Sequence, residues 1–217
     1  MDRPRVLLAD DHRMLREAFA QLLQPHCEIV GAVGDGRTLL AAAAELQPDI
    51  VVVDMAMPRL NGLEATRQLK RSMPQLKVIV LTINEDPELA AEAFRAGACS
   101  YLLKNSAVSE LLKAVEEAVQ GHSYVTPLVA EGLMAALAHA GKSAQKKDPT
   151  SPRQREVLQL VVEGYTMKQI ARILKIKPRT VAFHKYGMMR QLHVRSTAEL
   201  VQAAMRMGVI SRLPCAS

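Results

Sequence analysis

Five side chains at the ends of short apolar runs suggest the first chemistry in this sequence. They are Asp10, Asp11, Asp54, Thr82 and Lys104. A carboxylate that follows a run such as "VVV" at residues 51–53 is costly to bury unless a cation compensates its charge. Carboxylates that converge repel one another, and a hard divalent cation with oxygen ligands relieves that repulsion. The residue types therefore predict a metal site, with Mg²⁺ as the expected ion.

Five predicted strands, alternating with helices, position these side chains. The runs "RVLLAD", "CEIVGAV", "PDIVVVD", "KVIVLT" and "CSYLLK" predict strands, and segments such as "MLREAFAQLLQ" and "ELLKAVEEAVQ" have helical spacing. The alternation predicts an α/β fold in which helices cover both faces of a parallel sheet. In a flavodoxin-like strand order, 2-1-3-4-5, the five side chains lie at carboxyl ends of strands and converge on one crevice.

The motifs around these residues resemble a known family. "LLADDH", "VVVDMAMPRLNG", "VLTINED" and "AGACSYLLKN" are similar to the receiver domain of two-component response regulators over about residues 3–124. The resemblance implies that Asp54 is a nucleophile that accepts a phosphoryl group from a sensor histidine kinase. It makes Asp11 a direct Mg²⁺ ligand and Asp10 a ligand through water. Asp54 and the backbone carbonyl of Ala56 complete the protein ligands.

The same resemblance implies a conformational switch and a loop. Thr82 and Tyr101 match the family's switch pair: Thr82 would bind a phosphoryl oxygen, and Tyr101 would turn from solvent into the vacated space. Taken alone, Thr82 could instead satisfy local backbone, and Tyr101 could be a core residue. Pro58 and Gly62 match the loop after the phosphorylated residue.

Asn105 departs from the family, in which many members have a proline with a cis peptide bond after the lysine. A cis bond before a non-proline residue costs about 3 kcal/mol, and the role of Lys104 does not need it.

Charge divides the chain of 217 residues into an acidic and a basic part. Residues 1–125 hold 13 Lys and Arg against 17 Asp and Glu, whereas residues 148–217 hold 12 against 4. The basic part is expected to meet a polyanion.

Gly, Ser, Lys and Pro in "GKSAQKKDPTSP" predict a linker, which is helical in its earlier part. The expected domains are a receiver at 1–124, a partly helical linker at 125–149 and a second domain at 150–217.

The second domain is expected to be an all-α bundle of four helices. Ser151, with Gln154 as its capping partner, begins the first helix, Thr166 the second and Ser196 the fourth. The third helix begins near Pro178, and the tight connection before it predicts a helix-turn-helix whose second member enters the DNA major groove. Its predicted DNA-facing residues are Lys177, Arg179, Thr180, Ala182, Phe183, Lys185, Tyr186 and Arg190. Val181, Met188 and Leu192 are expected to face inward.

"REVLQLVVEGYTMKQIARILKIKPRTVAFH" resembles the LuxR-type DNA-binding domain, and the whole chain resembles the NarL/FixJ class of response regulators. Ala182 and Tyr186 stand where the family is often polar or charged, so its target DNA sequence is not transferable. Gly187 inside the third helix costs about 1 kcal/mol relative to Ala. Thr150 replaces a large apolar residue before the first helix. An outward Phe183 would suit a thymine methyl group; alternatively it packs against a neighbouring domain or is a core residue.

The resemblance implies a transcription regulator rather than an enzyme. Its expected partners are a sensor kinase, promoter half-sites bound as a homodimer, and RNA polymerase. A phosphatase of the haloacid dehalogenase type usually has a second Asp two residues after its nucleophile, and that position is Ala56. A further alternative is an atypical regulator whose DNA binding ignores phosphate.

The composition bears on where the protein acts. Cys27, Cys99 and Cys215 are too widely spaced for a disulfide framework or a zinc motif, which fits a reducing compartment. No apolar run approaches the roughly 20 residues that a membrane span needs, and no secretory leader pattern precedes the first strand. We expect a cytoplasmic protein that does not associate with membranes.

Overall fold

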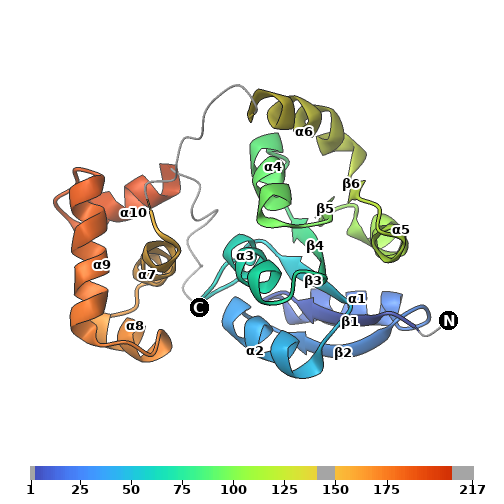
Figure 1. Cartoon of the computed structure of the whole chain (residues 1–217), viewed down its shortest axis with the longest axis horizontal. Helices are drawn as coiled ribbons and strands as arrows, with labels where there is room; N and C mark the ends of the chain where they lie inside the picture. Colours follow the sequence, from blue (N-terminus) through green and yellow to red (C-terminus); the bar gives the residue numbers. More distant parts are fainter. Residues whose placement is uncertain (1–2, 141–149, 207–217) are drawn as a thin grey trace. The chain divides into compact units, whose positions relative to one another are not determined.

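The structure is a computed structural model that describes residues 3–140 and 150–206 (Figure 1). The described residues form two compact units, residues 3–140 and residues 150–206. The first unit is an α/β sandwich and the second a bundle of helices. Each unit has its own hydrophobic core, as the predicted α/β and all-α domains require.

A parallel sheet of six strands forms the centre of the first unit. Its strands run in the order β2-β1-β3-β4-β5-β6. Their bounds are Arg5–Ala9 (β1), Glu28–Val33 (β2), Ile50–Asp54 (β3), Lys77–Thr82 (β4), Ser100–Leu103 (β5) and Tyr124–Val125 (β6). The five predicted strands and their flavodoxin-like order are confirmed, and β6 is an addition at the edge beyond β5.

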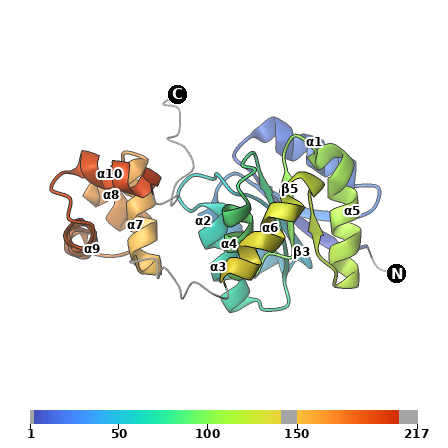
Figure 2. The ribbon, with the colours of Figure 1, turned by 90° about the horizontal axis from the view of Figure 1, so that it is seen from above.

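Helices cover both faces of this sheet (Figure 2). They are α1 (Arg13–Leu23), α2 (Gly36–Leu46), α3 (Gly62–Ser72), α4 (Pro87–Ala96), α5 (Ala107–Gln120) and α6 (Pro127–Ala140). Buried side chains of α1 and α5 form one core with the sheet, and those of α2, α3, α4 and α6 form the other. Along β3, Val51 and Val53 enter one core, while Ile50 and Val52 enter the opposite one. This alternation places the apolar run of β3 in the interior on both faces.

The first unit extends beyond residue 124, where the receiver was expected to end. Strand β6 pairs in parallel with β5, and α6 packs on α4. Val129, Leu133 and Ala136 of α6 are buried in the same core as Tyr101. Their spacing of four and three residues puts them on one side of the helix. The helical part of the expected linker at 125–149 thus belongs to the first unit, and residues 141–149 lie outside the described residues.

The second unit has the four helices that the sequence predicts. They are α7 (Pro152–Val162), α8 (Met167–Ile173), α9 (Pro178–Gln191) and α10 (Thr197–Arg206). Ser151 with Gln154, and Thr166 with Gln169, form complete capping boxes. Gly164 ends the first of these helices with a φ of 84°, a conformation that favours glycine.

None of the helices described over residues 3–140 and 150–206 is long and apolar enough to cross a membrane.

Candidate functional site

Four strand ends bring the predicted crevice residues together. Asp54 is the last residue of β3 and only 2% exposed, and Asp10 is buried directly after β1. The ammonium nitrogen Nζ of Lys104, which follows β5, lies 2.7 Å from Oδ2 of Asp10 and 3.0 Å from Oδ2 of Asp54. Thr82 is the buried last residue of β4. One lysine cation therefore bridges two buried carboxylates at the carboxyl ends of the strands and offsets only one of their two negative charges.

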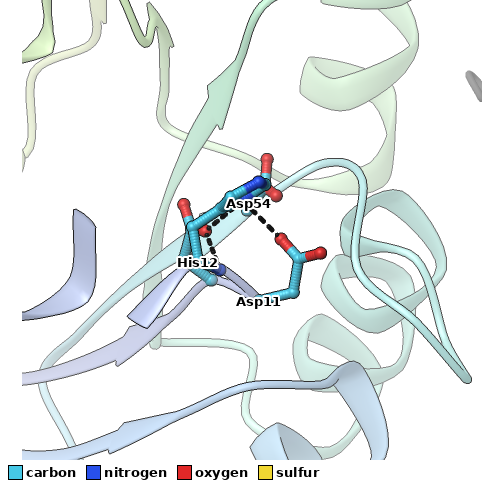
Figure 3. Close-up of side chains that lie close together, drawn as sticks. Asp11, His12 and Asp54 are labelled. Carbon is cyan, nitrogen blue, oxygen red and sulfur yellow. Dashed lines mark hydrogen bonds and ion pairs between the residues drawn. The ribbon is translucent and has the colours of Figure 1, made fainter. Parts of the chain in front are cut away.

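A cluster of possible metal ligands lies at the same edge. Single ligand atoms of Asp10, Asp11, His12 and Asp54 all lie within 4.8 Å of one another. Figure 3 shows Asp11 and His12 close to Asp54, and Asp11 is exposed whereas Asp54 is buried. Carboxylate oxygens that meet at the border between the interior and water suit a hard cation that keeps some of its waters. The donor set of the three aspartates therefore fits Mg²⁺.

His12 is the member of this cluster that the sequence motifs did not single out. Its Nδ1 lies 2.8 Å from Oδ1 of Asp11 and 3.3 Å from Oδ1 of Asp10. The backbone N–H of His12 also donates to Oδ1 of Asp10, at 2.8 Å. Its position directly after the acidic pair was the only signal that could have found it.

Burial and charge act in opposite directions on the crevice side chains. Burial raises the pKa of the Asp54 carboxyl; Lys104 lowers it, Asp10 raises it, and the net result lies above the ordinary value. Burial by itself would lower the pKa of Lys104, but attraction to Asp54 and Asp10 outweighs burial and raises it. Lys104 therefore stays a cation, and its charge favours the ionised form of Asp54.

The loop after Asp54 is packed so closely that two positions require glycine. A Cβ atom on Gly62 would lie 2.2 Å from the backbone oxygen of Asp54, and one on Gly36 would lie 2.0 Å from that of Leu60. The exposed Ala56 makes a backbone hydrogen bond to Asp54 that lowers the pKa of the carboxyl. The predicted role of its carbonyl as a metal ligand stays a prediction.

The predicted switch residues meet at the loop that follows β4. The backbone N–H of Asn84 donates to Oγ1 of Thr82 at 3.0 Å, and the hydroxyl of Tyr101 donates to the backbone oxygen of Asn84 at 2.9 Å. Tyr101 is fully buried. The Tyr101 ring thus occupies the interior position into which it was expected to turn from solvent. No peptide bond is cis within residues 3–140 and 150–206, which include the bond between Lys104 and Asn105.

Helix α9 presents an exposed aromatic and basic surface. Phe183 is 68% exposed and Tyr186 53% exposed, whereas Val181 and Met188 are buried on the opposite side. Leu192, expected to face inward, is half-buried. Lys177, Arg179 and Arg190 are exposed, and Thr180, Ala182 and Lys185 are half-buried.

An open groove of about 660 Å³ runs beside Phe183 and Tyr186. Met189, Arg190, Val194 and Arg195 complete its lining. Nζ of Lys185 lies 2.7 Å from Oγ1 of Thr197 at the start of α10, which holds the lysine close to the helix surface.

An acidic crevice with a bridging lysine on a flavodoxin-like sheet, followed along the chain by a helix-turn-helix bundle, is the combination that response regulators have. Residues 6–116 match the family model of the response regulator receiver domain, and residues 148–204 match that of bacterial regulatory proteins of the luxR family. The chain belongs to the NarL/FixJ-type response regulators of two-component systems, which are transcription regulators. The expectation of a regulator rather than a phosphatase is thereby confirmed.

Relatives of similar length support this assignment. The chain is 35% identical to the transcriptional regulatory protein LiaR of Bacillus subtilis, over 95% of this chain and 99% of LiaR. It is 33% identical to the oxygen regulatory protein NreC of Staphylococcus carnosus, over 93% and 97% of the two chains. Among solved structures, the RcsB response regulator of Salmonella typhimurium matches with a TM-score of 0.62 and 26% identity, over 94% and 97%. An RcsB–DNA complex matches with a TM-score of 0.58 and 25% identity, over 93% and 97%.

Proposed function

We propose that Asp54 accepts a phosphoryl group from a histidine of a sensor kinase and that this modification controls DNA binding by the second unit. The observation that carries the proposal is the placement of Asp54: its carboxylate ends β3, 3.0 Å from the Lys104 ammonium and inside the acidic cluster. A carboxylate oxygen of Asp54 bonds to phosphorus as the bond from phosphorus to the donor nitrogen breaks. The electron pair leaves with the imidazole, and Asp54 becomes an aspartyl phosphate.

The residues around Asp54 support this transfer electrostatically. Lys104 offers a fixed positive charge to the negative phosphoryl oxygens, and the Thr82 hydroxyl lies at the neighbouring strand end. Mg²⁺ held by Asp10, Asp11, Asp54 and the backbone carbonyl of Ala56 would supply further positive charge. Positioning and charge are the main contributions that a protein makes to phosphoryl transfer, and these residues supply both.

The output is binding of promoter DNA as a dimer. One of the solved structures that this chain resembles contains two RcsB dimers bound to two parallel DNAs. In this chain, α9 and Lys177 directly before it make the proposed DNA contacts. Lys177, Arg179, Thr180, Lys185 and Arg190 would face phosphates, and Ala182, Phe183 and Tyr186 would face base edges. RNA polymerase is a further proposed partner at the promoter. A regulator that binds promoter DNA would act in the cytoplasm.

The first experiment measures affinity for genomic DNA fragments by gel shift at fixed salt, with and without acetyl phosphate and Mg²⁺. Mass spectrometry verifies phosphorylation. We expect the phosphodonor to tighten binding by the wild type and to leave Asp54→Asn unchanged.

Asp49→Asn is the matched control. Asp49 directly precedes β3, at the amino ends of the strands and away from the crevice. It accepts a hydrogen bond from the backbone N–H of Arg5, which an asparagine can also accept. This variant should respond like the wild type. If verified phosphorylation leaves DNA affinity unchanged, the phosphate-independent alternative is correct and the proposed control of DNA binding is wrong.

A further inference from the structure

Thr126 occupies the junction between β6 and α6. It is buried, and its backbone N–H donates to the carbonyl oxygen of Tyr101 at 3.1 Å. Its own carbonyl accepts from Val129 at 2.9 Å, within the first turn of α6. The backbone of this one residue therefore joins α6 to β5, the strand that contains Tyr101.

The side chain of Thr126 makes two further connections. Its Oγ1 accepts the backbone N–H of Leu103 at 3.1 Å and donates to Oε2 of Glu110 on α5 at 2.6 Å. Leu103 is the last residue of β5. The neighbouring strand β6 pairs with β5 only as far as Tyr101, so it offers no strand partner to Leu103. The Thr126 hydroxyl thus takes the place of a strand partner for a buried N–H, which would otherwise be unpaired at considerable cost.

This contact lies next to the crevice. Leu103 directly precedes Lys104, and the backbone N–H of Lys104 donates to the carbonyl oxygen of Thr82 at 2.7 Å. The backbone that carries the Lys104 ammonium is therefore held from both sides, by Thr82 on β4 and by Thr126 beyond β5. A shift at Leu103 would move Nζ of Lys104 relative to Asp54.

Helix α6, which follows Thr126 directly, also contacts the element that follows the switch loop. A Cβ atom on Gly132 would lie 2.4 Å from Cγ of Pro87, the first residue of α4. Pro87 comes three residues after Asn84, which bonds both Thr82 and Tyr101. Helix α6 therefore contacts Pro87 after the switch loop, and Thr126, directly before α6, bonds the end of the strand that leads to Lys104.

We propose that Thr126 is a positioning residue for phosphoryl transfer: its hydroxyl, oriented by Glu110, fixes the end of β5 that carries Lys104 and secures α6 to the same strand end. The part of the proposal that concerns transfer rests on the proposed function of Asp54. The part that concerns α6 does not, because it depends only on the hydrogen bonds of Thr126.

The test compares Thr126→Val with Thr126→Ser in the full chain. Valine keeps the shape and removes the hydroxyl, whereas serine keeps the hydroxyl. The initial rate of Asp54 phosphorylation is measured against acetyl phosphate concentration at saturating Mg²⁺, and amide hydrogen exchange is measured at Leu103 and over the first turn of α6. We expect Thr126→Val to lower the maximal rate about tenfold, with little change in the half-saturating donor concentration, because Lys104 is misplaced rather than lost.

Faster exchange at Leu103 and Val129 should accompany that slower rate, and Thr126→Ser should restore both readouts. Glu110→Ala is the second variant: it leaves the Thr126 side chain in place but removes its acceptor, and it should give a smaller change in the same direction. If Thr126→Val matches the wild type, or if serine fails to rescue it, the hydroxyl has no positioning role. If the wild type is not phosphorylated on Asp54, the proposed function fails, and hydrogen exchange alone then decides whether Thr126 secures α6.

Discussion

The ammonium of Lys104 lies 3.0 Å from a carboxylate oxygen of Asp54, at the ends of two strands that are not neighbours in the sheet. Strand β4 separates them, so the lysine reaches across the end of β4. Burial raises the pKa of the Asp54 carboxyl, and the positive charge of Lys104 lowers it. The same cation therefore helps to keep the proposed nucleophile ionised and to attract the phosphoryl group.

Lys104→Met should slow phosphorylation of Asp54 by about 10²-fold, since it removes one fixed charge that stabilises the transferring group. It should also shift the pH profile of the rate to higher pH, because the pKa of Asp54 rises further without the lysine. Both effects are read from initial phosphorylation rates between about pH 5 and pH 9. Lys77→Met is the control, because Lys77 lies at the amino end of β4, whereas the crevice lies at the carboxyl end. An unchanged pH profile in Lys104→Met would contradict the electrostatic role.

Asp54→Asn should stabilise the first unit at neutral pH. The folded-state pKa of Asp54 lies above its ordinary value of 3.8, so the folded protein binds this proton more tightly than the unfolded chain does. The contribution of Asp54 to stability is therefore greatest below about pH 3.8 and declines as the pH rises through the folded-state pKa. Asparagine has no charge to bury.

We expect Asp54→Asn to gain roughly 1 kcal/mol at pH 7 and no stability relative to the wild type at about pH 3. Calorimetry of both proteins at each pH measures the difference. A gain of the same size at both pH values would mean that something other than the buried charge is responsible.

Gly62→Ala should destabilise the first unit by about 2–3 kcal/mol, because the new Cβ would meet the backbone of β3 rather than a side chain that can move. The Cβ position lies 2.2 Å from the oxygen of Asp54 and 2.9 Å from Cα of Met55. Urea unfolding measures the loss.

The matched control is Gly187→Ala in α9, where the nearest atom to the new Cβ is Nε2 of Gln154 at an ordinary 3.6 Å. There alanine should stabilise the second unit by about 1 kcal/mol through its helix propensity. Equal effects of the two substitutions would mean that the contact at Gly62 relaxes without cost.

The crevice could be predicted from sequence because each of its residues ends a recognisable strand. Asp54 and Lys104 are 50 positions apart, yet parallel strands bring their carboxyl ends to one edge of the sheet whatever lies between them. Tyr101 was predicted as a switch residue, but its inward position depends on a hydrogen bond to the backbone of Asn84, which no side-chain pattern encodes.

The edge beyond β5 could not be predicted in the same way. Strand β6 has two residues, too few for a period-2 pattern to be recognised. The apolar residues of α6 predicted a helix but not its surface of contact, since exposed Leu128 and Met134 are as apolar as buried Leu133. Thr126 was missed because its role depends on Leu103 and Glu110, which are distant in sequence.

Lys185→Ala should weaken binding to many DNA sequences alike, because an ammonium group reads phosphates rather than bases. The slope of log affinity against log salt should fall in magnitude by about one unit. Nζ of Lys185 donates a hydrogen bond to Oγ1 of Thr197, which keeps the positive charge of the lysine near the start of α10. Gel shifts at several salt concentrations provide the slope, with Lys113→Ala on α5 of the first unit as the control. A loss confined to one sequence would contradict a phosphate contact.

Phe183→Ala should instead change the preference at a single base pair. Phe183 is exposed, lies on α9 opposite the buried Val181 and Met188, and borders a groove that apolar side chains and two arginines line. An apolar ring in that place can contact a thymine methyl group, which only A·T pairs present in the major groove. Affinities for a panel of single-base variants of one bound fragment measure the preference, and each mismatch normally costs about 1–3 kcal/mol. The variant should lose discrimination at one position and keep it at the others; uniform weakening across the panel would contradict the base contact.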